Sequence, residues 1–163
     1  GLYLSRSGYQ QVLQQAKPGL FLSGSGDKIQ SFSNGPLQLT SPNGISVDSG
    51  SGLPFRIISG NFLTEEGKNS YRWKNMISFE KSLIGRIVIT DQDMDKFCYV
   101  SDICFTQKNR AEQPISEVFS FQDDRIEHIR LKFIKEEDHF SLHAGVNNKR
   151  EIKVYWSFNG IIF

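Results

Sequence analysis

Apolar and polar residues alternate along much of this chain with a period of two, and this pattern limits the fold more than any other feature of the sequence. The alternation is clearest over residues 71–79, 97–105 and 151–158. A period of two places successive side chains on opposite faces of a strand, so each segment is predicted to be a half-buried β-strand. Residues 97–105 are also apolar at several intervening positions, and we expect burial on much of both faces there.

Residues 125–134 are compatible with two kinds of regular structure. Ile129, Leu131 and Phe133 recur at every second position, as in a strand. The acidic pair that precedes the segment can instead cap a helix, in which Ile129 and Phe133 share one face. The strand is the favoured interpretation, and a single short helix near 125–134 is the alternative.

Shorter alternating segments fill most of the remaining chain, with turn signals between them. Gly, Asn, Ser and Pro cluster at 23–27, 33–36, 41–44 and 48–52, where Gly and Asn supply a positive φ and Pro fixes its own φ. Short strands between closely spaced turns predict an all-β fold, an antiparallel β-sandwich or distorted barrel of roughly a dozen strands. The shorter strands are expected at residues 1–5, 20–23, 29–33, 37–40, 45–47, 55–59, 84–90, 115–121 and 140–143.

Length and composition fit one domain with an unusual N-terminal segment. The 163 residues can bury a core without metal ions or disulfides, and 38% hydrophobic with 23% charged residues is typical of globular proteins. Residues 1–52 hold most of the Gly, Ser and Pro and few charges. We interpret residues 1–163 as a single sandwich domain, in which 1–52 form either edge hairpins or docking strands that pair with a partner, and 53–163 form the main sandwich.

Charge and cysteine content exclude several kinds of partner and cross-link. The net charge of +1 provides no long-range attraction for nucleic acid or anionic lipid. No apolar run approaches the roughly 20 residues of a membrane span. Cys98 and Cys104 lie about 20 Å apart along one predicted strand, whereas a disulfide needs Cα atoms within about 7 Å. We expect no internal disulfide, folding in a reducing cytoplasm, no nucleic-acid binding and no membrane insertion.

Acidic residues and histidines are grouped in places, but without the spacing of a catalytic or cofactor motif. Asp91, Asp93 and Asp95 are spaced as in a calcium-binding loop, yet the sixth position is not the Gly that such a loop requires. We interpret this segment as a solvated hairpin turn, with a calcium site as the weaker alternative. His139 and His143 are expected about 13 Å apart on one strand, too far to share a metal ion. We predict no enzymatic activity, cofactor or metal.

Aromatic residues leave one alternative function open. Tyr9, Phe62 and Tyr155 can stack on sugar rings if they are exposed, although aromatic side chains in a sandwich more often belong to the core. A glycan-binding module would carry exposed aromatic rings beside Asn and Asp on one face of a sheet. A lectin-like sandwich that binds a host-surface glycan is therefore the alternative to a structural role.

Four short segments carry a resemblance to a known family. The chain opens with Gly1-Leu-Tyr-Leu-Ser-Arg-Ser-Gly-Tyr-Gln-Gln-Val and continues with Pro-Gly-Leu-Phe-Leu-Ser-Gly-Ser at 18–25 and Lys28-Ile29. The C-terminal strand reads Trp156-Ser-Phe-Asn-Gly160. This combination resembles the small minor tail proteins of long-tailed bacteriophages, mainly over the segment from residue 1 to about residue 30.

The resemblance implies a non-enzymatic structural component of the virion at or near the tail tip, assembled in the host cytoplasm. Its partners would be other tail proteins, a hub or a central fibre, with several copies of the chain per tail. We expect docking by strands of the N-terminal segment and by loops of the sandwich. The residues expected to bind the partner are Leu2, Tyr3, Leu4, Tyr9, Leu20, Phe21 and Leu22.

Overall fold

The fold is all-β throughout the part of the chain that the structure describes. This structure is a computed structural model, and it describes residues 2–6, 9–10, 28–31, 34–64, 72–109, 112–122, 126–148 and 151–163. These residues form twelve β-strands and no helix. Residues 1–40 and 41–163 are two separate compact units. The predicted all-β class is confirmed, and each unit is described by itself.

The N-terminal unit contains an antiparallel sheet, called here the N-terminal sheet. Its central strand β1 (Leu2–Arg6) pairs with β2 (Tyr9–Gln10) on one side and with β3 (Lys28–Ser31) on the other. The strands predicted at residues 1–5 and 29–33 are therefore confirmed over the residues that the structure describes. The strand predicted at 20–23 lies outside the described residues.

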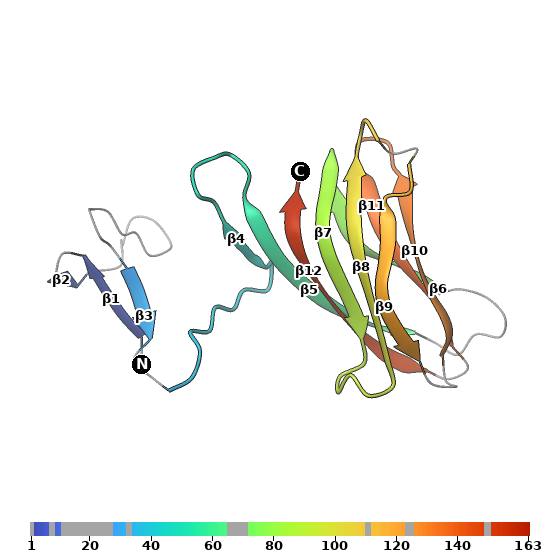
Figure 1. The fold of residues 1–163 in the computed structure, drawn as a ribbon, viewed down its shortest axis with the longest axis horizontal. Coiled ribbons are helices and arrows are strands. Elements are labelled where there is room, and N and C mark those ends of the chain that lie inside the picture. Colours follow the sequence, from blue (N-terminus) through green and yellow to red (C-terminus); the bar gives the residue numbers. More distant parts are fainter. Residues whose placement is uncertain are drawn as a thin grey trace. The chain divides into compact units, whose positions relative to one another are not determined.

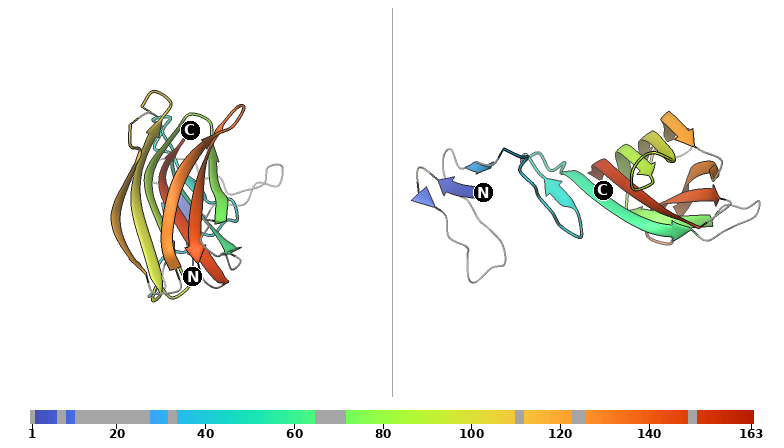
Figure 2. Two further views of the ribbon diagram at one scale, coloured as in Figure 1. Left: turned by 90° about the vertical axis from the view of Figure 1, so that its right-hand side faces the viewer. Right: turned by 90° about the horizontal axis from the view of Figure 1, so that it is seen from below.

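The described part of residues 41–163 forms a β-sandwich of two antiparallel sheets that do not close into a barrel (Figures 1 and 2). The large sheet has the strand order β4-β5-β12-β7-β8-β9, and the small sheet has the order β10-β11-β6. The strands of the large sheet are β4 (Ile45–Val47), β5 (Phe55–Thr64), β12 (Ile152–Ile162), β7 (Ser82–Thr90), β8 (Phe97–Thr106) and β9 (Ile115–Gln122). The strands of the small sheet are β10 (Ile126–Lys135), β11 (Phe140–Asn148) and β6 (Arg72–Phe79).

Strand β10 resolves the ambiguity of residues 125–134, and the alternative of a short helix there is wrong. A tight turn joins β10 to β11, and the two strands pair along their length, from Ile126 opposite Asn148 to Lys135 opposite Phe140. This pairing satisfies the backbone groups of β10 that face β11, and Ile129 is only 4% exposed. Tertiary pairing thus decided between two patterns that local sequence left open.

Residues 37–40 do not form the predicted strand. They are irregular, and Leu37 and Leu39 are 42% and 58% exposed. Pro36 and Pro42 bound the segment, and proline lacks the N–H that a strand donates to its neighbour. Alternation without a partner strand or a buried face was therefore not sufficient to form a strand here.

The core lies between the two sheets and is built from alternate positions of their strands. Leu83, Ile87 and Phe158 of the large sheet and Leu142 and Val146 of the small sheet are fully buried. Phe79, Phe105, Phe133 and Phe140 join the two sheets in an aromatic cluster with ring centroids 4.4 to 5.9 Å apart. This apolar contact layer is what the sequence alternation encodes.

Strand β8 is buried on both faces only at its start, so the expectation for residues 97–105 holds in part. Phe97, Cys98 and Tyr99 are buried, whereas Asp102 and Cys104 are exposed. From Asp102 onward, β8 therefore has one solvent-facing side.

Strands β7 and β12 approach each other unusually closely at a pair of glycines. A Cβ atom on Gly85 would lie 2.1 Å from the carbonyl oxygen of Asn159, and one on Gly160 would lie 2.1 Å from that of Ile84. Gly160 also has a φ of +151°, which side-chain-bearing residues rarely adopt. The centre of the large sheet therefore requires glycine at both positions.

Candidate binding surface of the large sheet

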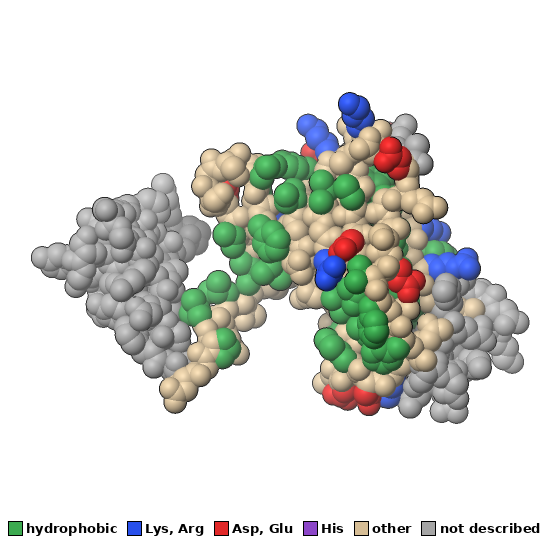
Figure 3. All heavy atoms as spheres, viewed as in Figure 1, with side chains coloured by type: hydrophobic (Ala, Val, Ile, Leu, Met, Phe, Trp, Pro, Cys, Tyr) green, Lys and Arg blue, Asp and Glu red, His purple; other side chains and the backbone are tan. Residues whose placement is uncertain are grey.

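The outer face of the large sheet is the side turned away from the small sheet, and Figure 3 looks directly onto it. Strand register arranges its side chains in rows across β5, β12, β7 and β8, because directly paired residues point to the same side. From one end of the sheet to the other, the rows are Phe55–Ile161–Ile84–Cys104, Ile57–Asn159–Arg86–Asp102, Ser59–Ser157–Val88–Val100 and Asn61–Tyr155–Thr90–Cys98. On β5, the first two rows carry the apolar side chains of Phe55 and Ile57, and the last two carry the polar side chains of Ser59 and Asn61.

Two groups of exposed apolar side chains lie at opposite edges of this face (Figure 3). The β4–β5 patch consists of Val47, Phe55 and Ile57, which are 58%, 44% and 42% exposed. The β9 patch consists of Phe119 and Phe121, which are exposed and contact each other edge to face with centroids 5.9 Å apart. Exposed apolar groups of this kind mark surfaces that contact other proteins.

An ion pair separates the two patches. Arg86 donates from Nε to Oδ1 of Asp102 at 2.8 Å and from Nη2 to Oδ2 at 3.1 Å, a bidentate arrangement. The hydrogen bond and the charge of Asp102 raise the pKa of Arg86, and the hydrogen bond from Arg86 lowers the pKa of Asp102. Both side chains are about half exposed, so solvent and salt screen the pair.

A groove of about 590 Å³ is hollowed into the polar end of the outer face. Strand β12 contributes its centre, β5 and β7 its sides, and the turn between β7 and β8 its end. The lining residues are Ser59, Gly60, Asn61, Val88, Thr90, Asp91, Gln92, Met94, Tyr155, Trp156 and Ser157. An aromatic ring, amides and hydroxyls therefore line one concave surface, as they do in small-ligand sites.

Two aromatic residues line the groove, Trp156, which packs against the core, and Tyr155, which lies on the outer face. Tyr155 is half-buried, and Nζ of Lys153 lies 5.5 Å from the centroid of its ring. Lys153 and Ser157 are its neighbours on the same side of β12, one before it and one after it along the strand. Ser157 lines the groove and Lys153 does not, and Asp91, Gln92 and Met94 continue the groove past Thr90, the residue opposite Tyr155.

The turn between β7 and β8 is held by a buried carboxylate. Oδ1 of Asp91 accepts hydrogen bonds from the backbone N–H groups of Lys96 and Phe97, both at 3.2 Å. Burial opposes ionisation of Asp91, but the bonds from Phe97, Asp95 and Lys96 outweigh it and lower its pKa. Met94, at the tip of the turn, has a φ of 54° and a side chain that is 58% exposed.

The calcium candidate falls on this turn, which is a hairpin turn as interpreted. The hydrogen bond with Asp91, and then burial, raise the pKa of Asp95. Asp93 and Asp95 are exposed, whereas Asp91 is occupied by the backbone of the turn. Among the residues that the structure describes, no group of three or more His, Cys, Asp or Glu side chains could hold a metal ion.

The outer face of the small sheet carries polar and charged side chains instead. Nζ of Lys132 lies 3.9 Å from the centroid of the Trp73 ring, a cation–π contact. Burial and then the charge of Lys132 lower the pKa of His143, whose Nε2 is buried and has no hydrogen-bond partner among the described residues. His143 is therefore a neutral neighbour of a cation at neutral pH.

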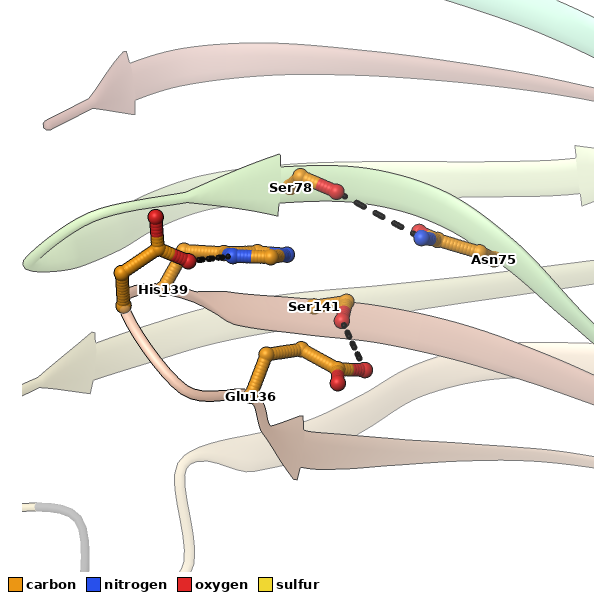
Figure 4. Close-up of polar contacts among 6 residues, drawn as sticks. Asn75, Ser78, Glu136, His139 and Ser141 are labelled. Atoms are coloured by element: carbon orange, nitrogen blue, oxygen red, sulfur yellow. Dashed lines mark hydrogen bonds and ion pairs between the residues drawn. The ribbon is translucent and has the colours of Figure 1, made fainter.

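Further polar contacts stabilise the end of the small sheet near the turn between β10 and β11 (Figure 4). Nδ2 of Asn75 donates to Oγ of Ser78 at 3.4 Å. The hydroxyl of Ser141 donates to Oε1 of Glu136 at 3.4 Å, and Nδ1 of His139 lies 2.7 Å from Oδ1 of Asp138. The hydrogen bond and the charge of His139 lower the pKa of Asp138.

The residues expected to bind the partner all fall in the N-terminal unit. Leu2, Tyr3 and Leu4 lie in β1, and Tyr9 lies in β2. Leu20, Phe21 and Leu22 are outside the described residues. The structure thus brings Leu2, Tyr3, Leu4 and Tyr9 into the N-terminal sheet, and their role in binding remains a prediction.

Sequence reasoning finds only part of the groove. Tyr155 and Asp91 stand out by residue type, whereas Asn61 and Met94 do not. The strand predicted at 55–59 extends to Thr64 as β5, which places Asn61 directly opposite Tyr155. The alternation continues beyond Ser59, with Asn61 facing outward and Phe62 packed against the core. This pattern is the sequence signal that predicts the longer strand.

Comparisons with known proteins do not identify relatives of this chain. No family model, curated protein or solved structure matches it. No helix in the described part of the chain is long and apolar enough to cross a membrane. The fold and the surface therefore define the class, an all-β sandwich with a grooved and partly apolar outer face.

Proposed function

We propose that this protein is a non-enzymatic structural component of a bacteriophage virion at or near the tail tip. The observation that carries the proposal is the division of the chain. The N-terminal segment that resembles minor tail proteins lies within the compact unit of residues 1–40, separate from the sandwich. Such a unit can bind a hub or fibre protein without disturbing the sandwich, because every described core residue lies in 41–163.

The N-terminal sheet suggests how docking occurs. In the described strand order, β2 and β3 are its edges, with β1 between them. An edge strand presents unpaired backbone N–H and C=O groups, to which a strand of a partner can add by β-augmentation. The apolar side chains of Leu2, Leu4 and Tyr9 would then supply specificity for a hub or central fibre.

The sandwich offers a second contact with tail proteins. The β4–β5 patch and the β9 patch are both exposed, at opposite edges of one face. A chain present in several copies around the tail could use these patches against its neighbours, because exposed apolar groups favour protein contacts. This second contact supports the same virion role and does not depend on the N-terminal unit.

Deletion of residues 1–40 tests the proposal. The deletion leaves every strand of the sandwich, because β4 begins only at Ile45. We expect the shortened chain to be absent from purified particles while circular dichroism and thermal unfolding report an intact β-fold. Leu2→Asp with Leu4→Asp in the full chain should have the same effect, and the exposed sandwich variant Lys74→Ala should be incorporated normally. Normal incorporation of the shortened chain would contradict the docking role.

A further inference from the structure

We propose that the groove on the outer face of the large sheet binds a neutral saccharide. This inference goes beyond a role in assembly, because it assigns a small-ligand site to the sandwich itself. The groove volume of about 590 Å³ lies within the range of roughly 300–1,000 Å³ that small-ligand pockets occupy.

The ring of Tyr155 supplies the apolar platform. Sugar rings present C–H groups on one face and hydroxyls around their edge, so they bind where an aromatic face adjoins hydrogen-bonding groups. The ring lines the groove between Ser157 and the turn residues that follow Thr90, whereas Lys153, whose Nζ lies 5.5 Å from the ring centroid, does not line it. The tyrosine hydroxyl adds a donor and an acceptor at the end of the same ring.

Amide and hydroxyl side chains adjoin this ring. Register places Asn61 opposite Tyr155 and Ser59 opposite Ser157. Directly opposite residues have Cβ atoms about 4.5–5.5 Å apart, so one sugar unit can contact the ring and the Asn61 amide together. Ser59 and Asn61 are exposed, and each both donates and accepts hydrogen bonds, as sugar hydroxyls require.

The charge around the groove favours a neutral ligand. Asp91 lines its end, and Asp93 and Asp95 are exposed in the same turn. The lowered pKa of Asp91 keeps its carboxylate ionised at neutral pH. A sialylated or sulfated sugar would bring a second negative charge toward this carboxylate, which is unfavourable in a partly buried site. A neutral hexose or N-acetylhexosamine unit meets no such repulsion.

The turn that ends the groove holds a conformation that sequence alone would not favour. Met94 has a φ of 54°, in the left-handed region that costs a residue with a side chain on the order of 1 kcal/mol or more. This conformation is combined with an exposed, flexible thioether at the rim of the groove. Backbone strain of this kind clusters at ligand sites, and here it lies beside the ring and amide already described.

A glycan array tests the inference with the full chain. The array carries neutral hexose and N-acetylhexosamine oligosaccharides together with sialylated and sulfated ones. We expect binding to neutral members and not to the anionic ones. Isothermal titration calorimetry with the strongest neutral oligosaccharide then measures Tyr155→Ala and Asn61→Ala, which should each weaken binding about tenfold or more, equivalent to ~1.4 kcal/mol.

The controls separate a site in the groove from a general effect of exposed aromatics or of unfolding. Phe119→Ala removes an exposed ring from the same face outside the groove and should leave the affinity unchanged. Asn61→Ala changes an exposed side chain, so its fold survives even if Tyr155→Ala destabilises the strand. No binding to any neutral sugar, preference for anionic sugars, or full affinity of Asn61→Ala would overturn the inference. None of these results bears on the proposed virion role, because that role is tested separately by deleting residues 1–40 and measuring incorporation into particles.

Discussion

The outer faces of the two sheets differ, although the same alternation of residues builds both. The large sheet exposes Phe55, Ile57 and Phe119 at its edges, whereas the small sheet presents the Lys132–Trp73 contact and hydrogen-bonded polar side chains. Both sheets bury equally apolar inner faces in one core. Inward residues therefore account for stability in both sheets, and outward residues distinguish a face suited to partners from a face suited to water.

The largest effect on the free energy of unfolding is expected from replacing one glycine of each sheet by alanine. In Gly85→Ala the new Cβ meets the backbone oxygen of Asn159 at 2.1 Å, whereas in Gly145→Ala it meets the Trp73 ring at 2.8 Å. Backbone cannot yield without separating β7 from β12, but a ring can rotate. We expect Gly85→Ala to lower the free energy of unfolding by about 3 kcal/mol and Gly145→Ala by about 1 kcal/mol, measured by urea unfolding.

The order of these two losses is the critical result. Ser157→Ala, three residues before Gly160 on β12, serves as a control in which no atom is added, and its effect on the free energy of unfolding should be small. Equal losses for Gly85→Ala and Gly145→Ala would mean that the two sheets tolerate crowding alike. The close approach of β7 and β12 would then not distinguish the large sheet.

An intermediate effect is expected on the pH dependence of stability, which we compare for a carboxylate in the β7–β8 turn and one in the β10–β11 turn. The pKa of Asp91 is lowered in the fold, so its carboxylate contributes stability above the unfolded pKa of about 3.9, and this contribution is lost as pH falls through the folded pKa. We expect Asp91→Asn to destabilise the protein by about 1 kcal/mol at pH 7 and to flatten the fall in stability below about pH 4.

Asp138 in the turn between β10 and β11 provides the matched control. Its pKa is also lowered, by the hydrogen bond and charge of His139, but its side chain is 88% exposed. Asp138→Asn should therefore change the pH dependence much less than Asp91→Asn. Thermal unfolding of both variants between about pH 2 and 7 measures the difference. A larger effect at Asp138 would contradict the structural role assigned to Asp91.

The smallest effect is expected from the ion pair between the two apolar patches. Arg86→Ala, Asp102→Ala and the double variant form a cycle that isolates the interaction of the two side chains. Because both are about half exposed, their coupling should be slight and should disappear in ~1 M salt. Coupling that persists at high salt would indicate that the pair is shielded from solvent, and that the outer face is covered in solution.

The all-β class follows from the sequence because a period of two encodes an inner and an outer face directly. The strand at residues 126–135 required its partner β11, since the same residues also fit one face of a helix. Residues 37–40 alternate equally well, but the flanking prolines and the exposed leucines leave them irregular. Alternation therefore indicates a strand reliably only where a neighbouring strand is available.

The groove was harder to predict from the sequence, because its residues become neighbours only through the pairing register of the strands. Asn61 and Tyr155 are far apart in the chain and become neighbours only when β5 and β12 pair. The same holds for Arg86 and Asp102 across β7 and β8. Residue type identified Tyr155 and Asp91 as candidates, but no local spacing joins them to Asn61 or Met94.

The two cysteines give the outer face a built-in labelling position. Cys98 is buried, and this burial together with the charge of Asp91 raises the pKa of its thiol, which suppresses its reaction with electrophiles. Cys104 is exposed on β8, at the opposite end of the row that begins with Phe55, and strands β7 and β12 lie between it and the β4–β5 patch. A maleimide fluorophore would therefore react selectively at Cys104 and would sense directly whether the outer face near β8 becomes covered when a partner binds.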